Sequence, residues 1–232
     1  MAGIAANTRR LTALPERLTT ADQRDLFARM QAACPAIPIE IEKGARKLAP
    51  AEKHRVERNN CENPEIYPIW PYREVSLLRP GLLAEAKLAF KTRKSFLPNG
   101  WGYDSNCAAL LGLTDEAASI LQTKAANSNG GYRWPATWGP NFDYQPDQNH
   151  GGNLLETTNL MLLQGESGGK ILLLPAWPKD WDVSFKLHAP NRTVVECVYR
   201  KGRIESLGVQ PESRRKDIQC SLPLPAEAET WR

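Results

Sequence analysis

Apolar positions follow two different patterns along the chain, and the change between them falls at Gly165. Before Gly165 they recur three or four residues apart, which is typical of amphipathic helices. After it, short runs alternate between apolar and polar residues, which indicates β-strands. The clearest helix covers residues 80–94, and its apolar face contains Leu82, Leu83, Ala86, Ala89 and Phe90. The pattern predicts an α+β protein with helices first, followed by a small antiparallel sheet or part of a β-sandwich.

Four further helices are expected, over residues 20–34, 101–113, 114–128 and 153–164. Thr20 and Gln23 have the spacing of a capping box, and Pro35 ends the helix that they begin. The helix after Gly152 contains the run LLETTNLMLL, which indicates burial on more than one side. Residues 1–18 and 35–60 show no clear period, so irregular structure is expected there.

Strands are expected at residues 170–174, 183–188, 193–199 and 203–209, with a tight turn at Lys201 and Gly202. Three regions follow from these patterns. Residues 1–166 form a helical region, residues 167–210 a β region, and residues 211–232 a polar, proline-containing tail that is expected to be mobile.

Composition narrows the class of protein. The chain has 232 residues, of which 41% are hydrophobic and 24% charged, as in ordinary globular proteins. The net charge of +4 is small and the basic residues are spread out, which argues against a nucleic-acid partner. No apolar run has the length needed to span a membrane, and the first residues lack the apolar core of a signal peptide. As written, the chain is therefore expected in the cytoplasm, without a membrane partner.

Cysteine and histidine spacing does not indicate a metal site. The five cysteines include no C-x-x-C pair, and the three histidines are never at metal-ligand spacing. Neither a metal nor another cofactor is expected.

The segment Trp138–Gln164 has the highest density of side chains that could take part in catalysis or binding. Its first half combines titratable, amide and aromatic side chains between several glycines and prolines, which predicts a loop. A polar, aromatic loop at the start of a buried helix is how a rigid scaffold presents a site. The alternative is ordinary turn chemistry, which uses the same residue types. The candidate residues here are Trp138, Asn141, Asp147, Asn149 and His150.

A second dense segment is CENPEIYPIWPYR, residues 61–73. Glu62 and Glu65 lie close together among aromatic residues, so they could act in acid–base chemistry or in sugar binding. The alternative is that they stabilise the amino end of a short helical turn begun by Pro64. Trp70 precedes Pro71, and tryptophan beside a stiff proline turn would make a platform for a sugar ring or simply pack in the core.

Several motifs in order resemble the C-terminal part of glycoside hydrolases with an (α/α)6 toroid. The closest resemblance is to the family 95 α-L-fucosidase and α-L-galactosidase group and its uncharacterised relatives. It is carried by ENPEIYPIWPYR, WGPNFDYQPDQNHGGN, MLLQ and ILLLPAWPKDW. The resemblance implies a partial toroid of helical hairpins followed by β structure. It also implies an oligosaccharide or polysaccharide substrate and hydrolysis with inversion.

The resemblance also implies roles for single residues. Asp147 matches the aspartate that acts as the base and positions the attacking water. Glu65 stands where the family has a substrate-contacting histidine, so the fucose specificity is in question. The remaining expected sugar contacts are Trp138, Asn141, Asn149, His150 and Trp70.

An inverting enzyme also needs a general acid, with the two carboxyl groups about 6.5–9.5 Å apart. In the resembled family that acid lies upstream of these motifs. Either Glu62 or Glu65 supplies it here, or the chain is the C-terminal piece of a longer enzyme, which is the reading we favour. An incomplete toroid would expose apolar helix faces and promote self-association. Relatives in the family are often secreted or periplasmic, so the cytoplasmic expectation applies only to the chain as written.

Two other classes remain open from the sequence. One is a carbohydrate-binding or structural piece without turnover. The other is a different toroidal class, such as a rhamnosidase-like hydrolase, a sugar phosphorylase or a polysaccharide lyase. The chain has no Gly-rich or Arg-rich phosphate loop for a phosphorylase. A lyase would need a base, commonly a tyrosine or a histidine, and Tyr144 and His150 are the candidates for it.

Overall fold

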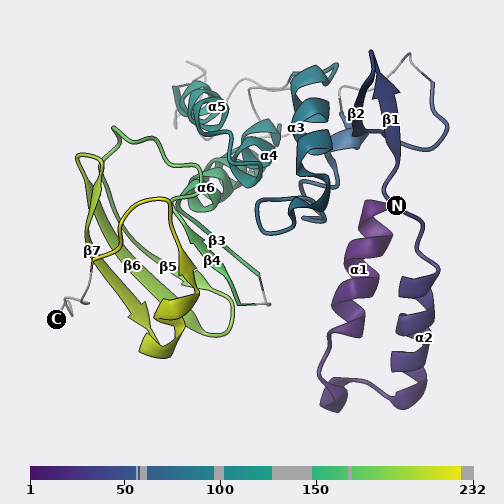
Figure 1. The fold of residues 1–232 in the computed structure, drawn as a ribbon, viewed down its shortest axis with the longest axis horizontal. Helices are drawn as coiled ribbons and strands as arrows, with labels where there is room; N and C mark the ends of the chain where they lie inside the picture. The colour runs from purple at the N-terminus through teal and green to yellow at the C-terminus, as the bar shows by residue number, and fades with distance from the viewer. Residues whose placement is uncertain (56, 58–61, 97–101, 127–147, 167–168, 226–232) are drawn as a thin grey trace. The chain divides into compact units, whose positions relative to one another are not determined.

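The computed structural model describes residues 1–55, 57, 62–96, 102–126, 148–166 and 169–225 (Figure 1). These residues combine helices with three small sheets and no barrel, so the predicted α+β class is confirmed. The chain divides into two compact units, Met1–Phe96 and Leu97–Arg232. No helix among the described residues is long and apolar enough to cross a bilayer.

The first unit begins with two helices, α1 (Ala2–Thr12) and α2 (Ala21–Ala32), joined by the short η1 (Glu16–Leu18). The expectation of irregular structure over residues 1–18 was wrong. Ala2 and Ala6 are four residues apart and both are buried, while α1 packs beside α2 (Figure 1). Arg9 also binds the Glu74 carboxylate, with its Nη2 at 2.6 Å from Oε1. Packing and this ion pair stabilise a helix that has only a weak apolar period.

Helix α2 has the predicted capping box. The Gln23 N–H donates to the Thr20 hydroxyl at 3.2 Å, and the Thr20 N–H donates to the Gln23 side chain at 2.9 Å. No residue of α2 is buried, and Leu26 and Met30 are 44% and 42% exposed. The amphipathic face of α2 was predicted, but its exposure was not.

A hairpin of β1 (Ile39–Glu42) and β2 (Ala45–Leu48) follows, which corrects the expectation of irregular structure over residues 35–60. Lys43 and Gly44 both have positive φ, at 50° and 83°, as a two-residue turn between antiparallel strands requires. The short η2 (Pro64–Ile66) comes next, then η3 (Pro80–Leu82) and α3 (Leu83–Thr92), and α3 packs against β2.

The second unit begins with α4 (Asp104–Leu110), α5 (Thr114–Ala126) and α6 (Gln148–Leu162), which pack on one another. The described part of α6 begins at Gln148, five residues before the predicted start at Asn153. Gly151 and Gly152 lie inside it, although they were predicted to end the preceding loop. A glycine inside a helix costs about 1 kcal/mol relative to alanine, and the buried face further along α6 offsets that cost.

Two three-stranded sheets complete the second unit. One has the order β3 (Leu163–Gly165), β4 (Ile171–Leu173), β8 (Ile218–Gln219), and the other is β5 (Val183–Ala189), β6 (Thr193–Arg200), β7 (Arg203–Gln210). The strands predicted between residues 170 and 209 are confirmed.

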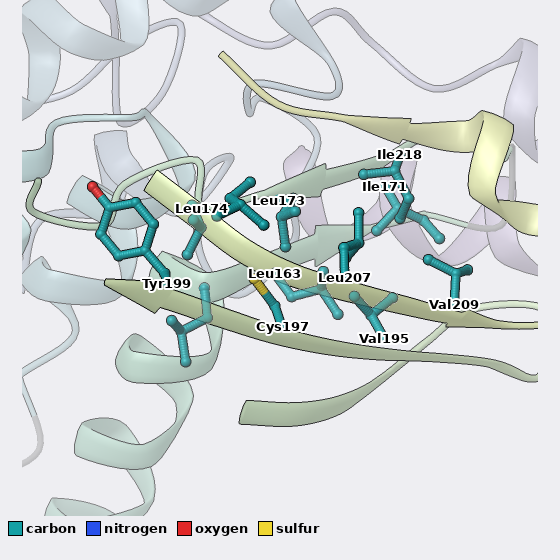
Figure 2. Packing of buried hydrophobic residues seen from close by; sticks show 12 residues of the cluster. Leu163, Ile171, Leu173, Leu174, Val195, Cys197, Tyr199, Leu207, Val209 and Ile218 are labelled. Carbon is teal, nitrogen blue, oxygen red and sulfur yellow. The ribbon is translucent and has the colours of Figure 1, made fainter. Parts of the chain in front are cut away.

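The predicted tail is not all irregular. It contains η4 (Glu212–Asp217) and β8, which pairs in parallel with β4. Residues from both sheets share one apolar core, shown in Figure 2, where Val195, Cys197 and Leu207 of one sheet lie with Ile171 and Ile218 of the other. Ile218 therefore belongs to the core because it completes a sheet, not because of its local sequence.

Candidate functional site

In the first unit, the segment 62–73 folds as a rigid turn. Pro64 occupies the first turn of η2, as predicted. The buried Asn63 side chain donates to the Ser95 carbonyl at 2.8 Å and accepts from the Ser95 N–H at 3.1 Å. The backbone N–H groups of Glu74 and Val75 both donate to the Pro68 carbonyl. These bonds hold the start and the end of the segment against the rest of the unit.

Glu62 is half-buried, and its carboxylate accepts a hydrogen bond from the Tyr67 hydroxyl. The Tyr67 ring meets the edge of Tyr72, with ring centroids 6.4 Å apart and an interplanar angle of 85°. Aromatic pairs favour this geometry. The tyrosine pair therefore orients the Glu62 carboxylate.

Glu65 lies in η2 and is only 5% exposed. Trp70, the predicted sugar platform of this segment, is half-buried. The two glutamates predicted as a pair thus differ in access to solvent. Glu62 is the one that a ligand in solution could reach.

An open groove of about 380 Å³ lies beside the tyrosine pair. Its walls include Tyr67, Tyr72, Pro64 and Pro68, and the first turns of α1 form the facing side. This volume is in the range of small-molecule sites, which combine apolar walls with a few polar groups. Gly3 lies so close to the Tyr72 ring that an added Cβ would be 2.8 Å from it. A larger residue there would displace the ring from the wall of the groove.

In the second unit, Trp138, Asn141 and Asp147 lie outside the described residues. Asn149 and His150 lie in the first turn of α6, and their side chains are likewise outside the description. The predicted catalytic carboxylates also belong to different units, Glu62 and Glu65 to the first and Asp147 to the second. Their separation therefore stays a prediction.

Helix α6 is fixed to α4 by buried polar side chains. The Thr157 hydroxyl donates to the Asn106 side-chain oxygen at 2.7 Å and lies 2.8 Å from the Ser105 hydroxyl. The Gln164 amide, just beyond α6, donates to the Ala109 carbonyl at 2.8 Å. Not every atom of this network is satisfied, because Asn106 Nδ2 and Gln164 Oε1 are buried without a hydrogen-bond partner among the described residues. The hydrogen bonds that are made attach the second half of α6 and the residue just beyond it to α4.

No protein-family model matches the chain, and no curated protein matches it. Within the described ranges, no group of three or more His, Cys, Asp or Glu side chains could hold a metal ion.

The sequence analysis missed Lys124 of α5. Lys124 is only 3% exposed and donates to the Gly102 carbonyl. Burial lowers its pKa to about 8, and the nearby Asp104 carboxylate opposes that shift. The sequence did indicate that Lys124 would be buried. Lys124 comes four residues after Ile120 and seven after Ala117, which places it on the buried face of α5.

Proposed function

We propose that this protein acts as an inverting glycoside hydrolase on a neutral sugar, related to the α-L-fucosidases, with helices that belong to an (α/α)6 toroid. The observation that carries the proposal is the ordered set of four motifs between residues 61 and 181. The geometry of the described residues supports it. Tyrosines and prolines of the first motif line a groove, one of these tyrosines donates to the Glu62 carboxylate, and the second motif leads into α6.

In the proposed reaction Asp147 is the base. Its carboxylate removes a proton from a water molecule that attacks the anomeric carbon, while a second carboxyl group protonates the leaving oxygen. Glu62 is the better candidate for the acid, because Glu65 is buried. The Tyr67 hydroxyl, which donates to Glu62, would stabilise the carboxylate that remains after proton transfer.

One observation favours a second candidate, a carbohydrate-binding module without turnover. The first described residue of α6 is Gln148, directly after Asp147 in the sequence, and aspartate is a preferred residue at the start of a helix. Asp147 would then stabilise α6 instead of activating water. The aromatic groove beside Tyr67 would be retained in this reading.

The substitution Asp147→Asn separates these two functions. Asparagine caps a helix about as well as aspartate does, but it cannot act as a base. We expect Asp147→Asn to reduce the release of aryl alcohol from aryl α-L-fucosides and α-L-galactosides by about 10²–10⁴-fold. The thermal midpoint should stay within about 2 °C of the wild type.

The matched control is Glu205→Gln, because Glu205 is an exposed carboxylate on β7 whose ion pair with Arg203 is also exposed. This variant should keep the full rate, and NMR of the first product should show the inverted anomer. Hydrolysis that survives Asp147→Asn would overturn the role of Asp147. No hydrolysis of any aryl glycoside by the wild type, together with sugar binding, would favour the second candidate.

A further inference from the structure

A second groove, of about 410 Å³, lies in the second unit between the start of α5 and the loop that follows β4. We call it the Trp177 groove. Its walls include Trp177, Asp180 and Tyr199 on one side and Thr114 and Asp115 on the other. None of these residues belongs to the proposed catalytic site. The groove is therefore a separate feature of the second unit.

The loop that forms the groove is held firmly in place. Leu174 and Ala176 donate their backbone N–H groups to the carbonyls of Leu162 and Met161, at 2.8 and 3.3 Å. At the far end, the Tyr199 hydroxyl donates to the Lys179 carbonyl at 3.0 Å. A binding site formed before the ligand arrives loses little conformational entropy on binding.

Two contacts with Trp181 fix the orientation of the Trp177 ring. Its indole N–H donates to the Trp181 carbonyl at 2.7 Å. The two indole rings meet edge to face, with centroids 5.4 Å apart and an interplanar angle of 82°. Trp177 is half-buried and lines the groove, so it offers an apolar surface of defined orientation.

The charged groups that line the groove are two carboxylates, Asp115 and Asp180, and one amine, Lys179. Asp115 and Asp180 are exposed, and an ionised carboxylate accepts hydrogen bonds but does not donate them. Asp180 lies close enough to the Tyr199 hydroxyl to help raise the pKa of that phenol, after the larger effects of burial and of Cys220. The hydroxyls of Thr114 and Ser221 complete the rim.

A groove that combines an indole surface with two carboxylates is complementary to a pyranose ring, which has an apolar C–H face and an edge of hydroxyl donors. Two carboxylates against the single Lys179 amine leave the lining with a net negative charge, which disfavours an anionic sugar. We propose that the Trp177 groove binds one neutral pyranose ring, stacked on Trp177, with its hydroxyl groups donating to Asp115 and Asp180. The groove is a fact of the fold, whereas the choice of a sugar as ligand rests on the proposed function. The groove would hold a second part of the same polysaccharide, away from the bond that is cleaved.

The experiment is saturation-transfer difference NMR on the full chain. The neutral probes are methyl α-L-fucopyranoside and methyl β-D-galactopyranoside. The comparison probes are methyl β-D-glucuronopyranoside, which is anionic, and tetramethylammonium, which is cationic. We expect saturation transfer to a neutral probe, with affinity reduced about tenfold or more by Asp180→Asn, since hydrogen bonds to charged groups are the strong ones. Trp177→Ala should reduce it by at least as much.

Asp180→Asn keeps the test valid if Trp177→Ala fails to fold, because Asp180 is exposed. Glu205→Gln is again the control and should leave binding unchanged. Binding of neutral probes that none of the groove variants affects would overturn the proposal. Binding of the glucuronide or of tetramethylammonium in preference to the neutral sugars would also overturn it.

The outcome is independent of turnover. If aryl glycosides are not hydrolysed but a neutral sugar still binds in a manner sensitive to Asp180→Asn, the groove proposal stands and the hydrolase proposal fails. If Asp147→Asn abolishes hydrolysis while Asp180→Asn and Trp177→Ala leave sugar binding unchanged, the hydrolase proposal stands and the groove proposal fails.

Discussion

Glu62 and Glu65 are three residues apart, yet their side chains have different surroundings. Glu65 is buried in η2, while Glu62 is half-buried and accepts a hydrogen bond from Tyr67. The sequence analysis named both as candidate acids because they lie close together among aromatic residues. Glu65 lies inside the short helix η2, whereas Glu62 precedes it, and only Glu62 bonds to the Tyr67 hydroxyl.

Lys124 is a charged residue in an unusual environment, because its side chain is buried. Burial lowers its pKa from 10.5 to about 8, so the folded protein releases this proton at a lower pH than the unfolded chain does. Between about pH 8 and pH 10.5 the unfolded state binds more protons at this position, and the free energy of unfolding should rise with pH. Below pH 8 the buried charge destabilises the fold by a constant amount.

We therefore predict a pH-dependent difference between the wild type and Lys124→Met, which keeps the length of the side chain. From pH 7 to pH 10 the wild type should gain about 2–3 kcal/mol relative to the variant. Urea unfolding of both proteins over this range measures the difference and removes contributions that they share, such as those of Cys197 and Tyr199. A difference that stays constant with pH would mean that Lys124 is not buried in its charged form.

At the scale of elements, helix α6 depends on α4 for its position. The Thr157 hydroxyl connects the two helices by donating to Asn106. Thr158, the next residue, donates only to the Leu154 carbonyl of its own helix, at 2.9 Å. These adjacent threonines allow the contact between the helices to be tested without changing helix propensity.

We expect Thr157→Val to lower the free energy of unfolding by about 1–3 kcal/mol, because it leaves the buried side-chain oxygen of Asn106 without this donor. Thr158→Val should change it by less than about 0.5 kcal/mol. Valine keeps the branched shape of threonine in both cases. Urea denaturation measures both effects, and equal losses in the two variants would show that the hydroxyl of Thr157 does not connect α4 and α6.

At the scale of the whole molecule, burial is uneven. Strand β6 places Val195, Cys197 and Tyr199 in the sandwich core (Figure 2), whereas α2 has no buried residue. Local opening costs least where few apolar contacts are lost. Helix α2 belongs to the first unit and strand β6 to the second, so the local opening of each can be followed separately.

Hydrogen exchange should show this difference directly. We expect the amides of α2 to exchange orders of magnitude faster than those of β6, and those of α1 to be intermediate because Ala2, Ala6 and Thr8 are buried. Mass spectrometry of peptides from the full chain resolves the three elements. Protection of α2 equal to that of β6 would mean that a partner or a second copy covers the exposed face containing Leu26 and Met30.

Local patterns alone determined much of this protein. The capping box at Thr20 and Gln23, the strands β4–β7 and the turn at Lys201 and Gly202 depend on neighbours in the sequence, and each was predicted from them. The mixed α and β class follows from the same short-range periods. The proposed roles of Asp147 and His150 also rest on the sequence, through the motifs that contain them.

Tertiary contacts decided the rest. Helix α1 forms where its alanines pack and where Arg9 meets Glu74, which lies 65 residues later. The short strand β8 exists because β4 offers it an edge, and Lys124 is buried because α5 packs on its neighbours. The two grooves join residues far apart in the chain, such as Asn7 with Tyr67 and Asp115 with Trp177. A local pattern cannot specify such pairs, because the free energy that brings them together comes from burial in the folded chain.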